Sequence, residues 1–168
     1  MKTCAFTGHR PQKLKYLVNK DDERFAILKR QITEVSIHVI ENYQVNRFLS
    51  GMALGVDMLA AEVILKLRKV YPDISLECVL PCENQAKKWL QKERERYESI
   101  LSHCDKVTTL QKMYTDDCMI NRNRYMIDHA DVLVAVWNQQ IGGGTGYTVK
   151  YAQSLGVPVI VIDPTEIM

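Results

Sequence analysis

The sequence lacks any long uninterrupted apolar run, since no stretch approaches the roughly 18 residues that a membrane-spanning helix needs. We also expect no secretory signal, because Met1-Lys2 leads directly into the polar stretch Thr7-Gly8-His9-Arg10. Its five cysteines form no CxxC pair, and an odd number of cysteines without a secretory segment is typical of reduced thiols in a cytosol. We therefore expect a cytoplasmic protein with no membrane partner.

An excess of charge of one sign is also missing, because 22 basic residues balance 20 acidic ones and leave a net charge of +2. Such a balance creates no global field that would draw the chain onto nucleic acid or lipid. Any anion site must therefore be local.

Several enzyme motifs are absent as well. The four histidines lie far apart and none belongs to an HExxH motif, so we expect no metal site. The Walker pattern GxxxxGK[ST] does not occur, and no GxGxxG follows the first predicted strand. These absences disfavour P-loop ATP hydrolysis and an ordinary dinucleotide dehydrogenase.

The 168 residues suit one domain, which we predict to span residues 1–168. Apolar runs alternate with helical patterns, which favours an α/β fold with a mostly parallel sheet and helices on both faces. The polar run at 106–110 suits a sheet edge, whereas the apolar runs at 132–137 and 157–162 suit strands covered on both faces. The charged pattern after residue 85 predicts a helix with Ala86, Trp89 and Tyr97 on its apolar side.

Polar turns follow four of the predicted strands, at residues 7–10, 50–57, 81–85 and 138–145. In parallel sheets, ligands bind outside the carboxyl ends of the strands, near the point where the strand order reverses. We therefore expect these four turns to form one ligand site.

Two of these turns are rich in glycine. In Ser50-Gly51-Met52-Ala53-Leu54-Gly55-Val56-Asp57, the glycines permit tight geometry and close approach of a ligand, and Ser50 can donate a hydrogen bond or cap the next helix. In Gly142-Gly143-Gly144-Thr145-Gly146, bare backbone N–H groups at a helix start can hold a phosphate, with Thr145 adding a hydroxyl. The alternative for each is a simple connection between a strand and a helix.

Two arginines could pair with a phosphate through both guanidinium nitrogens. Arg10 is fixed between Gly8 and Pro11 at a strand end, whereas Arg122 adjoins Asn123 on the apolar side of a predicted helix. The alternative for each arginine is a surface ion pair. The placement of Arg122 beside Asn123 favours a polar wall of the site.

The remaining candidates each have two interpretations. His9 could serve as an acid or base, or as a hydrogen-bonding wall residue. Asp57 could cap its helix, contact a ribose hydroxyl or act at an anomeric carbon. Glu83 and Gln85 are helix-start residues that could also contact a ligand.

These residues resemble a known family, the YpsA-like proteins of the SLOG superfamily. The likeness runs from about residue 3 to residue 161. The superfamily also includes the LOG phosphoribohydrolases and the DNA-processing protein DprA. The resemblance is carried by Thr7-Gly8-His9-Arg10-Pro11, by the residues 50–57, by Pro81-Cys82-Glu83-Asn84-Gln85, by Trp89 and Tyr97, and by Asn123-Arg124-Tyr125-Met126-Ile127-Asp128.

The resemblance implies a Rossmann-like domain with strand order 4-3-2-1-5-6, in a bacterial cytoplasmic protein that binds a nucleotide or nucleotide derivative. Similar members are proposed to sense NAD- or ADP-ribose-related ligands. The LOG pattern PGGxGTxxE ends in a glutamate that supports cleavage of the N-glycosidic bond, and Thr148 stands at that position here. Arg122 matches a catalytic arginine of those enzymes, but without the glutamate the match leaves catalysis open.

Our first hypothesis is a binding module for a nucleotide or an NAD- or ADP-ribose-like ligand. The alternative is an enzyme that hydrolyses the N-glycosidic bond of a nucleotide, with Asp57, Glu83 and Arg122 as candidate catalytic residues. A DprA-like single-stranded DNA-binding protein is the third, although the chain lacks the basic surface and interleaved aromatics that this needs. We also expect self-association through the long helices.

The predicted ligand site gathers residues from all four turns and from the helix before the fifth strand. Its members are Thr7, Gly8, His9, Arg10, Ser50, Gly51, Met52, Ala53, Gly55, Asp57, Glu83, Gln85, Arg122, Asn123, Gly143, Gly144 and Thr145.

Overall fold

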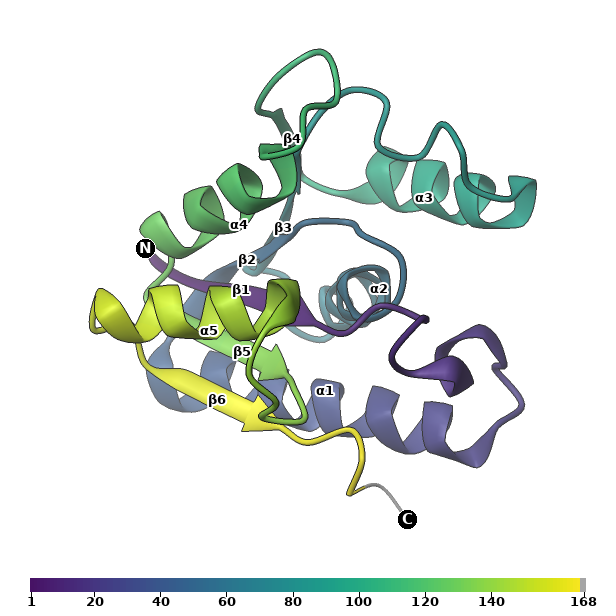
Figure 1. Cartoon of the computed structure of the whole chain (residues 1–168). Helices are drawn as coiled ribbons and strands as arrows, with labels where there is room; N and C mark the ends of the chain where they lie inside the picture. The colour runs from purple at the N-terminus through teal and green to yellow at the C-terminus, as the bar shows by residue number, and fades with distance from the viewer. Residues whose placement is uncertain (167–168) are drawn as a thin grey trace.

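In the computed structural model, which describes residues 1–166, six strands form one parallel sheet with the order β4-β3-β2-β1-β5-β6 (Figure 1). The predicted α/β class and strand order are therefore confirmed. The strands are β1 (Lys2–Gly8), β2 (Val45–Ser50), β3 (Ser75–Leu80), β4 (Lys106–Thr109), β5 (Val132–Val136) and β6 (Val159–Ile162). The helices are η1 (Lys15–Val18), α1 (Glu23–Tyr43), α2 (Val56–Leu67), α3 (Gln91–His103), α4 (Cys118–Asp128) and α5 (Gly143–Ser154).

The helices cover both faces of the sheet because side chains alternate along each strand. On β1, Cys4 and Phe6 face one core, which α1, α2 and α3 complete, and Phe6 stacks on Phe48 of β2 at 5.8 Å between ring centroids. Ala5 faces the second core, which α4 and α5 complete with residues such as Met126 and Val149. The sheet is thus the middle of three layers.

The strand order reverses at β1, which lies between β2 and β5. The chain leaves β1 toward one edge of the sheet and, after β4, crosses back to β5 on the other side. The connections therefore separate beyond the carboxyl ends of β1 and β5, and a crevice is expected there. None of the helices within residues 1–166 is both long and apolar enough to cross a membrane.

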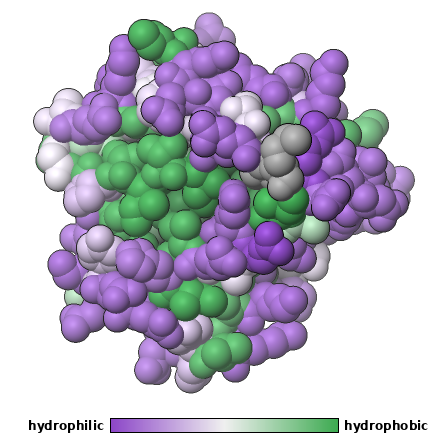
Figure 2. Space-filling model, turned by 90° about the horizontal axis from the view of Figure 1, so that it is seen from below, coloured by the Kyte–Doolittle hydropathy of each residue, from purple (hydrophilic) through white to green (hydrophobic). Residues whose placement is uncertain are grey.

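Two predictions about single elements were wrong. The run at 157–162 was expected to be covered on both faces, but β6 is the last strand of the sheet and its Val161 is 39% exposed. Apolar side chains gather on the face of the molecule where β6 and α1 lie (Figure 2). The helix expected from Ala86 begins only at Gln91, because residues 83–89 form turns that leave Trp89 outside it.

A buried carboxylate ties together the three strands on one side of β1. Glu77 of β3 accepts hydrogen bonds from Arg47 of β2, at 2.5 Å from Nη2, and from Thr108 of β4, at 2.7 Å from Oγ1. Burial would raise the pKa of Glu77, but the hydrogen bonds from Thr108 and Arg47 outweigh burial and lower it. This cluster fixes the registers of β2 and β3, whose ends lie near the crevice.

Arg47→Ala should therefore lower the free energy of unfolding by about 3 kcal/mol, because it leaves the Glu77 carboxylate buried without its cation. The lowered pKa of Glu77 adds a part of the stability that depends on pH. This part is present above about pH 4.3, the ordinary pKa of a glutamate, and is lost as the pH falls, because the Glu77 carboxylate of the unfolded state binds the proton more readily than that of the folded state. Urea denaturation at pH 7 and pH 4 measures both effects. Arg30→Ala is the matched control, since Arg30 pairs with Glu34 at 3.9 Å on the exposed surface. Equal losses for the two variants would contradict the prediction.

Candidate functional site

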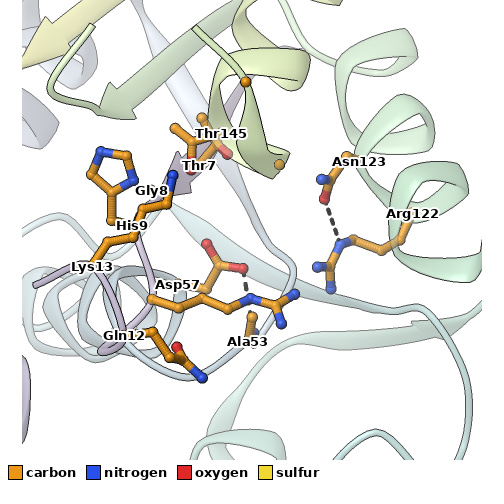
Figure 3. A pocket seen from close by; sticks show the side chains of 13 residues that line it. Thr7, Gly8, His9, Gln12, Lys13, Ala53, Asp57, Arg122, Asn123 and Thr145 are labelled. Carbon is orange, nitrogen blue, oxygen red and sulfur yellow. Dashed lines mark hydrogen bonds between the residues drawn. The ribbon is translucent and has the colours of Figure 1, made fainter. Parts of the chain in front are cut away.

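A cavity of about 390 Å³ opens where the carboxyl end of β1 meets the starts of α2 and α5 (Figure 3). Four segments far apart in the sequence supply its walls. Three of them belong to the predicted turns at 7–10, 50–57 and 138–145, and the fourth is Arg122-Asn123 of α4, whereas the predicted turn at 81–85 does not line this cavity. The lining residues are Thr7, Gly8, His9, Arg10, Gln12, Lys13, Ala53, Asp57, Arg122, Asn123, Gly142, Gly144 and Thr145.

The charge of the lining is mainly positive. Arg10, Lys13 and Arg122 line the cavity together with one carboxylate, that of Asp57. Lys13 lies against the start of α5, since a β-carbon added at Gly143 would be 3.0 Å from the Lys13 Nζ. Within residues 1–166, none of the three cations has a carboxylate oxygen within 4.0 Å. The site is therefore suited to an anion.

Arg122 is buried on α4, with only 2% of its surface exposed. Its Nη1 donates to the carbonyl oxygen of Gly51, and its Nε donates to the Asn123 Oδ1 at 2.8 Å. Burial lowers the pKa of Arg122, while the Asp57 carboxylate acts in the opposite direction. Arg122 and Asn123 thus form one polar wall of the cavity, as their sequence positions predicted (Figure 3).

Asp57 lies in the first turn of α2 and is 7% exposed. Its Oδ2 accepts the backbone N–H of Ala53 at 3.3 Å. Burial raises the pKa of Asp57, and Arg122, the Ala53 N–H and Arg10 oppose that rise. Asp57 therefore closes its own loop as a cap does and also presents a carboxylate to the cavity, so both predicted roles are compatible with its position.

Four predicted residues of the 50–57 turn do not line the cavity but lie behind its lining. They are Ser50, Gly51, Met52 and Gly55. The Ser50 hydroxyl donates to the Asp57 carbonyl oxygen at 2.8 Å and accepts the Met52 N–H at 3.2 Å. At Gly51, a β-carbon would lie 2.5 Å from the Arg122 guanidinium. Gly55 has φ +95°, and a β-carbon there would lie 2.8 Å from the His9 carbonyl oxygen. In this turn the glycines therefore make room for neighbouring groups of the protein.

The glycine run at 142–146 is arranged differently. Gly142 and Gly143 have φ of +94° and +73°, and α5 begins at Gly143. A β-carbon at Gly142 or Gly144 would meet nothing within 4 Å, so packing does not demand glycine there. The N–H groups of a first helical turn have no intrahelical acceptor, and this turn borders the cavity through Gly144 and Thr145.

His9 holds the loop before α5. Its Nε2 accepts the backbone N–H of Asn138 at 3.2 Å, which requires that nitrogen to be unprotonated. Burial lowers the pKa of His9, and Lys13 lowers it further, against the opposing effects of Asn138 and Asp163. His9 therefore lines the cavity as a neutral imidazole.

Other predicted residues lie elsewhere. Glu83 is exposed and lies outside the cavity lining, whereas Gln85 lines a neighbouring cavity. Sequence reasoning missed Gln12 and Lys13, whose only signal was a polar, basic loop directly after β1. Among the described residues, no group of three or more His, Cys, Asp or Glu side chains could hold a metal ion.

The pKa of His9 predicts a pH dependence of stability. Because the folded state resists protonation, the unfolded state takes up the proton first as the pH falls below about 6.5, and the free energy of unfolding decreases. His9→Gln keeps an acceptor for the Asn138 N–H without titrating. Melting temperatures at pH 7.5 and 5.5 should therefore fall more for the wild type than for His9→Gln, and equal decreases would contradict this account.

Comparison with known proteins agrees with this architecture. The YpsA family model, described as the YspA SLOG family, matches residues 4–165. A UPF0398 protein of Bacillus cereus strain ATCC 14579 is 31% identical over 158 residues, which are 93% of this chain and 85% of the relative. A UPF0398 protein of Bacillus licheniformis is 30% identical over 155 residues, covering 91% of this chain and 84% of the relative. The chain therefore belongs to the YpsA family of SLOG proteins.

Proposed function

We propose that this protein binds a nucleotide or nucleotide derivative, with a phosphate group between Arg10, Lys13 and the start of α5. The observation that carries the proposal is the position of Lys13, whose ammonium lies against Gly143 in the first turn of that helix. Membership of the family supports a nucleotide-related role.

The electrostatics of this arrangement favour an anion. A helix N-terminus carries a partial positive charge, so a lysine beside it is unfavourable unless an anion lies nearby. Arg10 lines the same cavity and adds a second positive charge. A phosphate would accept hydrogen bonds from both side chains and from the backbone N–H groups of the helix start.

Other lining residues suit the sugar of such a ligand. Asp57 and Asn123 both line the cavity, and their oxygens can accept hydrogen bonds from ribose hydroxyls. Thr7 and Thr145, which are 6% and 8% exposed, add small polar side chains to the lining. The cavity therefore offers groups that can bind a phosphate and groups that can bind hydroxyls.

The proposal predicts that Lys13→Ala and Arg10→Ala each weaken ligand binding about tenfold or more, because each removes a charge-assisted hydrogen bond to phosphate. Calorimetric titration with nucleotides, NAD, ADP-ribose and ribose 5-phosphate at fixed ionic strength measures the effect. Lys15→Ala is the matched control, since Lys15 is exposed on the same loop and lies outside the cavity lining. If Lys13→Ala and Lys15→Ala bind the ligand equally well, or if no phosphorylated ligand binds the wild type, the proposal fails.

A second candidate function is hydrolysis of a nucleotide's N-glycosidic bond, and it rests on the position of Asp57. This carboxylate lines the cavity with Arg122, so it could stabilise positive charge that develops on the sugar. Glu83, the other predicted carboxylate, is exposed outside the lining.

Hydrolysis predicts that the wild type releases free base from a nucleoside monophosphate, detectable by liquid chromatography. Asp57→Asn should abolish the release, whereas Glu83→Gln, the matched carboxylate outside the cavity, should retain it. A melting curve would verify that Asp57→Asn is folded. Binding without release of base would leave the protein as a binding module only.

A further inference from the structure

A second cavity, of about 260 Å³, adjoins the first and shares Arg10, Gln12 and Ala53 with it. Because the same three residues line both cavities, one extended ligand could occupy the two together. The lining residues that belong to the second cavity alone are Leu54, Cys82, Gln85, Trp89, Tyr114 and Met119.

The second cavity differs from the first in chemistry. Its own lining contains no charged side chain, but it contains the two aromatic residues Trp89 and Tyr114 and the thioether of Met119. Trp89 packs edge-on against Tyr97, with 5.1 Å between the ring centroids and 82° between the planes, which fixes the orientation of its indole. Tyr114 is 58% exposed. Aromatic side chains of this kind bind flat heteroaromatic rings by stacking.

Gln85 adds a polar feature to this lining. Its Nε2 lies 3.3 Å from the Gly51 carbonyl oxygen, which can only accept a hydrogen bond, so the amide orientation is fixed. The same nitrogen lies 3.3 Å from the Tyr97 hydroxyl. The Gln85 Oε1 is then buried without a hydrogen-bond partner among the described residues. That oxygen is enclosed by the protein, so Gln85 is a fixed part of the cavity wall, held by Gly51 and Tyr97, and its oxygen offers no contact to a ligand.

We infer that the second cavity holds the base of the ligand, with its ring against Trp89. This inference rests on the proposed function, since it places the phosphate and sugar of the same ligand in the first cavity. Arg10 and Gln12 lie at the junction of the two cavities. The ligand class is therefore a nucleoside phosphate, in which the base is bound as well as the sugar phosphate.

The test compares ligands with and without a base. The monophosphates AMP, GMP, CMP and UMP and the base-free ribose 5-phosphate are titrated calorimetrically into the wild type. At least one of the four nucleotides should bind about tenfold or more tightly than ribose 5-phosphate, because stacking adds binding energy. If all four nucleotides bind no more tightly than ribose 5-phosphate, the inference is overturned while the proposed function stands. If neither ribose 5-phosphate nor any nucleotide binds, the proposed function itself fails.

Two substitutions in the second cavity test whether the base of the ligand binds there. Trp89→Ala and Tyr114→Ala should weaken nucleotide binding and leave ribose 5-phosphate binding unchanged. Tyr114→Ala should fold even if Trp89→Ala does not, because the exposed side chain of Tyr114 contributes little to the core. Leu90→Ala is the matched control, since Leu90 is 79% exposed, adjoins Trp89 and does not line the cavity. Unchanged nucleotide affinity in both aromatic variants would overturn the assignment.

Fluorescence gives a further readout of the stacking. The chain has two tryptophans, so Trp137→Phe leaves Trp89 as the sole indole, and nucleotide binding should change its fluorescence while ribose 5-phosphate should not. Unchanged Trp89 fluorescence on nucleotide binding would overturn the placement of the base.

Discussion

The burial of one guanidinium is the constraint on which the candidate site depends. Arg122 is among the largest fully buried side chains of the described chain, and a buried charge is costly unless it is paired and hydrogen-bonded. The Gly51 carbonyl oxygen, the Asn123 side chain and the field of Asp57 meet that requirement. Arg122 also leaves no room for a β-carbon at Gly51, and the Asp57 carboxylate at the start of α2 lies within its electrostatic influence.

The cations of the first cavity nevertheless have different surroundings. Asp57 is the carboxylate of the lining, and Arg122 acts on it more strongly than Arg10 does. The side chains of Arg10 and Lys13 come from the segment after β1, and they are exposed rather than held in the core. An incoming phosphate would therefore meet Arg10 and Lys13 without breaking a buried interaction, whereas Arg122 already has protein partners.

The fold could be predicted from local patterns, because alternating strand and helix signals and polar strand ends both follow from short stretches of sequence. The role of Gly51 could not be predicted in this way. Position 51 must be glycine because a β-carbon there would collide with Arg122, which lies 71 residues later in the chain. The sequence did not distinguish Lys13 from Lys15, because both lie in the same basic loop. Only the position of α5 in the fold shows that Lys13 borders the cavity. The periodicity that placed Trp89 in a helix concealed its position in a turn, where it lines the second cavity.

The position of Thr148 bears on the choice between binding and hydrolysis. In the resembling LOG pattern a glutamate stands there, but here the fully buried Thr148 donates its hydroxyl to the Gly144 carbonyl oxygen at 2.8 Å. The threonine hydroxyl therefore bonds within α5, and the residue presents no acid to the cavity. Asp57 is the carboxylate that remains in the lining, and it already accepts the Ala53 N–H beside Arg122. A carboxylate engaged in this way is better placed to hold a sugar hydroxyl than to move a proton, which favours binding over turnover.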